Sequence, residues 1–226
     1  MSDRDFFREV DEAVRQDRYK ELWDKYGVYA LAVAVLIVAG VAGFKVWSFW
    51  QERQAQAAGT EFSQSVTQLD SGDATKARTA LNALAETGPA GYRVLSRFQL
   101  AAAEAQAGDT DKAVALYDAL ANDAETDTIL KGLATIQAAT LRLDTADYVE
   151  MERRLKGLID QGSPWRYSAR ELLGLSAYRQ NNIPGAEKQF SELVADQATP
   201  QNLRERADMM LALIVGVPQA LSTTAK

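Results

Sequence analysis

The stretch GVYALAVAVLIVAGVAGF, residues 27–44, holds eighteen consecutive residues without a formal charge, in a chain in which 25% of the residues are charged. As a helix, this stretch would extend about 27 Å at ~1.5 Å per residue. The aromatic segment 45–50 lengthens it beyond the roughly 30 Å hydrocarbon core of a bilayer. Tyrosines at its start and tryptophans at its end suit the two membrane interfaces. The sequence therefore predicts one transmembrane helix over residues 26–50.

A cleaved signal peptide and a buried core helix are the alternatives to a membrane span. The apolar region of a signal peptide is normally ~7 to 15 residues long and follows a short basic segment. Here twenty-six residues of mixed charge precede a longer apolar stretch. A core helix this apolar would be unusual in a chain with a mean hydropathy of -0.24. We therefore expect a retained anchor.

The distribution of Lys and Arg around the apolar stretch predicts its orientation. Positive residues favour the cytoplasmic side of a membrane, and acidic residues contribute little to this bias. Two positive residues follow the stretch within about twenty residues, Lys45 and Arg53. Five precede it: Arg8, Arg15, Arg18, Lys20 and Lys25. We expect residues 1–25 to be cytoplasmic and the long C-terminal part to lie outside.

Residues 1–25 read as a short amphipathic helix, with Ser2 or Asp3 as its N-cap. Its modest apolar face follows helical spacing and consists of Phe6, Phe7, Val10 and Val14. Such a helix either lies on the inner leaflet of the membrane or docks onto a cytoplasmic partner. The sequence leaves both interpretations open.

The composition excludes several kinds of chemistry. Cysteine and histidine are both absent, so disulfides, thiol nucleophiles, the usual general base and the commonest metal ligand are absent as well. From Gln51 onward, eighteen Lys and Arg against twenty-three Asp and Glu give a formal charge of -5, which argues against nucleic acid as a partner.

An enzyme is the other functional class to weigh, because paired carboxylates can perform acid–base chemistry. Two such pairs, Glu150 with Glu152 and Asp109 with Asp111, fall on expected helices and caps, where carboxylates are usually solvated surface charges. A buried carboxylate pair with a perturbed pKa in a cleft would favour an enzyme instead. We expect no catalytic residue, no cofactor and no metal.

Beyond residue 50 the pattern changes to alanine-rich amphipathic segments separated by short turn signals. These signals are Ser71-Gly72-Asp73, Gly88-Pro89, Gly108-Asp109, Asn122-Asp123, Asp144-Thr145, Gly162-Ser163-Pro164, Asn181-Asn182 and Thr199-Pro200. The pattern predicts an all-α domain of antiparallel helix pairs over residues 51–216, followed by a flexible tail, residues 217–226.

A repeat is visible in the small residues that paired helices need where they cross. Four pairs of positions are separated by twelve residues each, and the second members follow one another at intervals of 36, 38 and 35 residues. The pairs are Ser65 and Ala77, Ala101 and Ala113, Ala139 and Met151, and Gly174 and Ala186. Apolar residues follow each second member at plus four and plus seven.

This pattern resembles the tetratricopeptide repeat, whose unit has about 34 residues, small residues at two helix-crossing positions and a proline near its end. Leu173-Gly174 with Ala186 and Phe190 match best, and Pro89 falls at the closing position. Met151 departs from the alanine that the repeat favours, which makes the third unit the doubtful one. The resemblance implies an α-solenoid of degenerate tetratricopeptide-like helix pairs, and an array of helical hairpins without this kinship is the alternative.

The order of segments resembles the YfgM-type family, the ancillary subunits of the SecYEG translocon. The residues that carry the likeness are Asp11-Glu12-Ala13-Val14, Trp23, Lys45-Val46-Trp47, Gly162-Ser163-Pro164-Trp165 and Ala198-Thr199-Pro200. The resemblance implies a single-pass protein of the bacterial inner membrane with a periplasmic interaction domain. Its partners would be translocon subunits and periplasmic chaperones or client polypeptides. An adaptor for another envelope assembly or division complex is the alternative.

The tetratricopeptide frame also implies a groove lined by the first helix of each unit. Its candidate residues are Phe62, Val66, Leu69, Phe98, Ile136, Leu143, Leu175 and Tyr178. An apolar surface of this kind suits an amphipathic helix or an unfolded segment. The alternative is that these are ordinary core residues, because apolar residues at helical spacing usually face the core.

Overall fold

The computed structural model describes residues 3–159 and 163–216. The chain divides into two compact parts, an N-terminal part (residues 1–57) and a C-terminal part (residues 58–226). Ser2, the proposed tail 217–226 and Gly162 lie outside the described residues, so the expectations for them stay predictions.

The N-terminal part is formed by helix α1, Asp3–Ser71, whose last turns belong to the C-terminal part. Within α1, Lys25–Ser71 contains a stretch with a mean hydropathy of 2.4 that is 0% buried. Its side chains are open to the surroundings: Leu36 is 71% exposed and Val38 67%. By length and composition this helix is able to cross a membrane.

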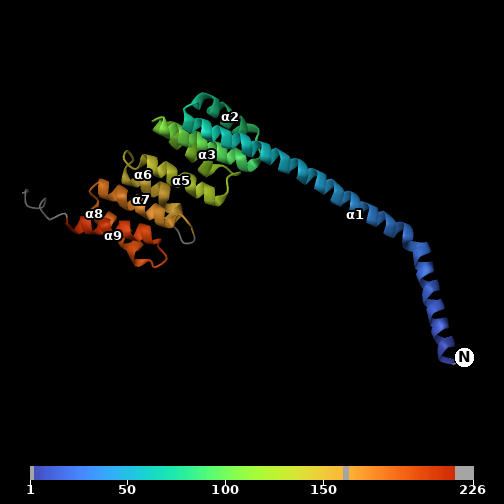
Figure 1. Cartoon of the computed structure of the whole chain (residues 1–226). Helices are drawn as coiled ribbons and strands as arrows, with labels where there is room; N and C mark the ends of the chain where they lie inside the picture. Colours follow the sequence, from blue (N-terminus) through green and yellow to red (C-terminus); the bar gives the residue numbers. More distant parts are fainter. Residues whose placement is uncertain (1–2, 160–162, 217–226) are drawn as a thin grey trace, which may run out of the picture. The chain divides into compact units, whose positions relative to one another are not determined.

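The C-terminal part is all-α over its described residues, as expected. It consists of the end of α1, then α2 (Ala74–Thr87), α3 (Ala90–Gln106), α4 (Thr110–Asn122), α5 (Thr128–Arg142), α6 (Tyr148–Ile159), α7 (Arg166–Arg179), α8 (Ile183–Ala195) and α9 (Gln201–Gly216). Figure 1 shows α2 to α9 stacked in chain order, and from α2 onward each helix packs against the next. This is the α-solenoid arrangement that the repeat predicted.

The burial of the crossing positions confirms the repeat frame. Ala77, Ala101 and Ala113 are completely buried, and so is Met151, which replaces the favoured alanine in the third unit. Gly174 lies against the ring of Phe190 in the partner helix. Each unit therefore pairs a first helix (the end of α1, α3, α5, α7) with a second helix (α2, α4, α6, α8).

Three of the turns inside the units share one hydrogen-bonding scheme, the Schellman motif. In the second unit the Gly108 N–H donates to the carbonyl of Ala105, and the Asp109 N–H donates to that of Glu104. The corresponding residues in the first and fourth units, Gly72 and Asn181, also have positive φ angles, of 93° and 59°. Glycine and asparagine are the residues that adopt this conformation most readily. The turn signals in the sequence therefore have a direct backbone cause.

The core continues across the unit boundaries. One cluster joins Ala101, Tyr117 and Ala138, which belong to α3, α4 and α5, and another joins Met151 of α6 to Leu173 of α7. In a solenoid, neighbouring units stabilise one another through such interfaces. Buried clusters therefore link neighbouring repeat units along the stack.

Trp165 holds the connection between the third and fourth units onto α5. Its indole Nε1 donates a hydrogen bond of 2.8 Å to the carbonyl of Ile129. A Cβ at Gly132 would lie only 2.2 Å from Cδ1 of this ring. Gly132 is thus needed for the close approach of the indole.

Candidate interaction surfaces

The eight candidate groove residues all lie on first helices and are all half-buried. Phe62, Val66 and Leu69 are on the end of α1, Phe98 is on α3, Ile136 is on α5 and Leu143 is its C-cap, and Leu175 and Tyr178 are on α7. The first helices α5 and α7 contact each other directly, as do α7 and α9. The frame therefore places the candidates on one series of neighbouring helices.

Most of these candidates also support the core. The Phe62 ring lies 5.9 Å from that of Tyr92, and the Phe98 ring lies 5.9 Å from that of Tyr117. All eight except Val66 pack against buried clusters. Their inner sides therefore stabilise the domain, and the assignment of their outer sides to a groove stays a prediction.

Two residues that the sequence reasoning missed are more open than the eight candidates. Leu95 of α3 is 40% exposed, and Thr140 of α5 is also exposed. Thr140 lies one turn from both Ile136 and Leu143, so it shares their side of the helix. Its spacing from these two residues indicates Thr140 as well, although threonine does not share their apolar character.

Three cavities of the helical domain lie between second helices, away from the candidate groove. One of them, of about 460 Å³, lies among α4, α5 and α6 and is lined by Asp118, Ala121, Asn122, Thr135, Glu150, Arg153 and Arg154. Two similar cavities lie among α2, α3 and α4 and among α6, α7 and α8. None of the eight candidates lines any of these three cavities.

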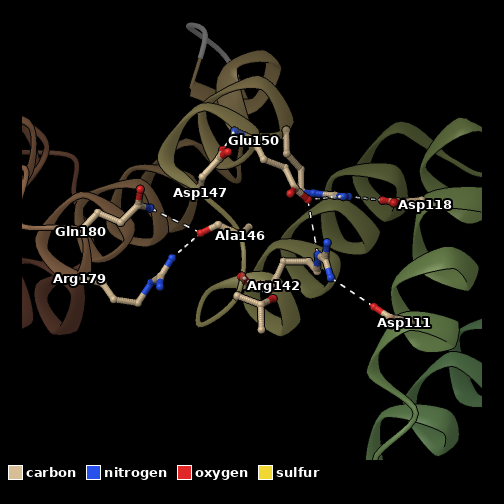
Figure 2. Close-up of polar contacts among 10 residues, drawn as sticks. Asp111, Asp118, Arg142, Ala146, Asp147, Glu150, Arg179 and Gln180 are labelled. Atoms are coloured by element: carbon tan, nitrogen blue, oxygen red, sulfur yellow. Dashed lines mark hydrogen bonds and ion pairs between the residues drawn. The ribbon is translucent and has the colours of Figure 1, made fainter.

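A network of ion pairs joins the helices around the 460 Å³ cavity. Figure 2 shows Arg142 between Asp111, at 3.2 Å, and Glu150, at 3.5 Å. Arg154 pairs with both Glu150 and Asp118. Glu150 is thus partly buried and neutralised by two guanidinium groups, whereas the Asp111 side chain is 92% exposed. The network fixes α6 against α4 and α5, and it gives Glu150 a structural role in place of the surface position that the sequence suggested.

The shifted pKa values among the described residues have local causes. A hydrogen bond from the Glu125 N–H, followed by the nearby Arg97, lowers the pKa of Asp123. A hydrogen bond from the Ala198 N–H, followed by the Tyr167 hydroxyl, lowers the pKa of Asp196. Both aspartates follow second helices, where these contacts cap the turns. A carboxyl group with a lowered pKa is a poor proton donor or acceptor near neutral pH.

Burial raises the pKa of the Tyr117 hydroxyl, and burial together with the Glu152 charge raises that of Tyr148. Both phenols therefore stay protonated near neutral pH. Over residues 3–159 and 163–216, no three Asp or Glu side chains converge to form a metal site.

Comparison with known proteins gives one family. Searches of curated proteins and of solved structures found no match. A family model described as a tetratricopeptide repeat-like domain matches residues 20–214, a range that includes the apolar stretch and all four helix pairs. The buried crossing positions agree with this match. The chain belongs to the tetratricopeptide repeat-like domain family.

Proposed function

We propose that this protein is a membrane-tethered interaction module of the bacterial periplasm, an accessory of the Sec translocon that links it to periplasmic chaperones or emerging client polypeptides. The observation that carries the proposal is that one chain combines an apolar helix with a tetratricopeptide repeat-like domain. The apolar stretch of this helix is 0% buried. Large apolar side chains in this number are stable only where water is excluded. The domain is therefore confined to a membrane surface.

The excess of Lys and Arg before the apolar stretch supports the orientation with the domain outside the cytoplasm. The absence of cysteine from the whole sequence means that the domain needs no disulfide in an oxidising compartment. The likeness of the segment order to YfgM-type proteins supports the translocon as the partner.

The tether provides a physical reason for weak individual contacts. A domain held at the membrane meets partners at a channel exit at a high effective concentration. Half-buried apolar side chains on the first helices, such as Val66 and Leu175, then suffice for brief capture of an amphipathic helix or an unfolded segment. Clients released by the channel would expose such segments.

The alternative is an adaptor for another envelope assembly or division complex with the same arrangement of anchor and repeats. The tetratricopeptide repeat-like family supports both, because its helical stack is a general platform for protein partners. The two proposals differ in the partner that contacts the first helices.

The test uses the absence of cysteine, which allows one thiol to be placed at will. Thr140→Cys on α5 reports on the first-helix surface, and Ala119→Cys, at an exposed position of the second helix α4, is the matched control. The full-length variants are treated in membranes with a thiol-specific photocrosslinker, and the captured proteins are identified by mass spectrometry. We expect translocon subunits, chaperones or exported chains from Thr140→Cys and few from Ala119→Cys.

Crosslinks from Thr140→Cys to division or cell-wall proteins would support the adaptor instead. Equal capture at both positions would refute the assignment of the first helices as the binding surface. A companion measurement tests the orientation: protease added to spheroplasts should digest residues beyond the span and spare residues 1–25. Protection of the helical domain would refute the periplasmic location.

A further inference from the structure

Helix α9, the last one described, has the position of a first helix in a fifth repeat unit. Leu203 and Ala207 of α9 follow Ala169 and Leu173 of α7 by 34 residues. All four side chains are buried against the preceding helices. In the described chain no second helix follows α9, so α9 lacks the partner that α8 provides for α7.

The side of α9 turned away from α8 is open. We call it the α9 face, and its exposed residues are Glu205, Asp208, Met209, Ala212, Leu213 and Val215. Met209 is 60% exposed, Leu213 55% and Val215 81%. The residue that corresponds to Met209 in α7, Leu175, is half-buried and packs against the cluster shared by α7, α8 and α9. Terminal helices of solenoids normally have a polar outer side, so this apolar face is unusual.

The charged residues of the α9 face are both acidic. The two arginines of α9 are engaged elsewhere: Arg206 binds Glu171 through hydrogen bonds of 2.6 and 2.8 Å, and Arg204 donates to the backbone carbonyls of Asp196, Gln197 and Thr199. Arg206 is itself exposed and lies one turn before Met209, but its charge is balanced by Glu171. Among the described residues, Glu205 and Asp208 therefore give the α9 face a net negative charge.

Asp208 occupies the position that corresponds to Gly174. In the fourth unit, Gly174 permits the ring of Phe190 to approach α7 at the helix crossing. An exposed aspartate at the same point of α9 favours an approaching helix that presents a cation there. The apolar side chains Met209 and Leu213, one turn apart, provide the hydrophobic part of the same surface.

We propose that the α9 face is a docking site for a cationic amphipathic helix of another polypeptide, which packs on α9 as α8 packs on α7. Its apolar side would cover Met209 and Leu213, which lie one turn apart, and a Lys or Arg would pair with Asp208. Apolar anchors at helical spacing with charges at the edge are the usual means by which proteins bind a helix in a groove. This site is separate from the first-helix surface near Thr140 and does not depend on its role.

The test measures binding of a labelled synthetic helix to the full-length protein in zwitterionic lipid nanodiscs. The probe is a peptide of Leu, Ala and Lys, with leucines at helical spacing and the length of α8, 13 residues. A second peptide has Glu in place of every Lys, and empty nanodiscs give the background. We expect fluorescence anisotropy to show binding of the Lys peptide and much weaker binding of the Glu peptide.

Three variants locate the binding. Because buried apolar anchors dominate helix recognition, the double variant Met209→Ser, Leu213→Ser should bind the Lys peptide at least about tenfold more weakly. Asp208→Lys should reverse the preference between the peptides. Val149→Ser, an equally exposed valine on α6, should change nothing. All four side chains are exposed, so the melting temperature should stay constant in every variant.

Equal binding of the Lys peptide to the wild type and the double variant would overturn the proposal. Two other occupants give distinct results. Removal of residues 217–226 would raise binding about tenfold if the chain's own end covered the face, and this outcome would also overturn it. A dimer detected by mass photometry and abolished by Leu213→Ser would assign the face to a second copy instead. Failure of any kind here leaves the crosslinks from Thr140→Cys unaffected.

Discussion

Replacement of Gly174 by leucine tests the repeat frame most directly. A Cβ at this position would lie 2.9 Å from Cζ of Phe190, 3.0 Å from Cε1 and 3.2 Å from Cβ of Gln189. Phe190 is 1% exposed and among the largest fully buried side chains, so its ring has no free space into which to move. The branched side chain of leucine would therefore push α7 and α8 apart.

The expected loss follows from two opposing effects. Overpacking in a well-packed core costs roughly 1–3 kcal/mol, and this site is at the upper end because the first added atom already meets a buried ring. Replacement of a glycine in a helix interior raises helix propensity, which stabilises the folded state by about 1 kcal/mol. The net loss in the free energy of unfolding is then about 2 kcal/mol, which lowers the melting temperature by roughly 4–8 °C for a domain of this size.

The matched control is Gly157→Ala on α6, where an added Cβ meets nothing within 4 Å. This change brings only the gain in helix propensity, so stability should rise by about 0.5–1 kcal/mol. Both variants are measured as full-length protein in detergent, by circular dichroism during heating and during urea unfolding. A loss of stability in Gly174→Leu together with a gain in Gly157→Ala would show that packing decides the result at Gly174.

A double-mutant cycle completes the test. Phe190→Ala alone should cost about 3–5 kcal/mol. Together with Gly174→Leu it should cost at least about 1 kcal/mol less than the sum of the two, because the leucine fills space that the ring vacates. An unchanged melting temperature for Gly174→Leu, or strictly additive losses, would refute the proposed contact between the paired helices.

Two further predictions concern the unit boundaries. Gly132→Ala should destabilise the domain by about 1–3 kcal/mol, because the new methyl group displaces the Trp165 ring from α5, and the intensity and wavelength of tryptophan fluorescence should shift; unchanged fluorescence and stability would contradict the contact. The pKa values of Asp123 and Asp196 are lowered in the folded state. The stability they contribute is therefore present above the unfolded value of 3.8 and is lost as the pH falls through the lower folded values. Between about pH 5 and pH 3, the urea concentration at the unfolding midpoint should accordingly fall less for the double variant Asp123→Asn, Asp196→Asn than for the wild type. An equal fall in both proteins would contradict these contacts.

The sequence alone was sufficient for the helix pairs because their determinants are local. The turn at Gly108-Asp109 is specified by a residue that adopts a positive φ and by a cap whose side chain accepts from the Lys112 N–H. The crossing positions, such as Ala101, could be found because a small residue is required wherever two backbones approach. The apolar stretch 27–44 was equally evident, since its length and lack of charge need no tertiary information.

Only the tertiary structure decided which part of each side chain stays exposed to solvent. Phe62 and Phe98 were chosen as groove residues from their spacing, yet one side of each ring packs against Tyr92 or Tyr117. Spacing along a helix defines a direction, but the amount of surface left open depends on neighbouring helices that are distant in sequence. The same limit applies to Glu150, whose pairing with Arg142 and Arg154 joins helices that no local pattern relates.

The open side of α9 shows this division most clearly. The sequence predicts that residues 201–216 form a helix with an apolar side, but an apolar side is expected for any helix that packs on a neighbour. The structure shows that Leu203 and Ala207 face the core while Met209 and Leu213 face away from it. Local propensity and periodicity thus determine the helices and their pairing, whereas the free surface is decided by which sides of each helix its neighbours cover.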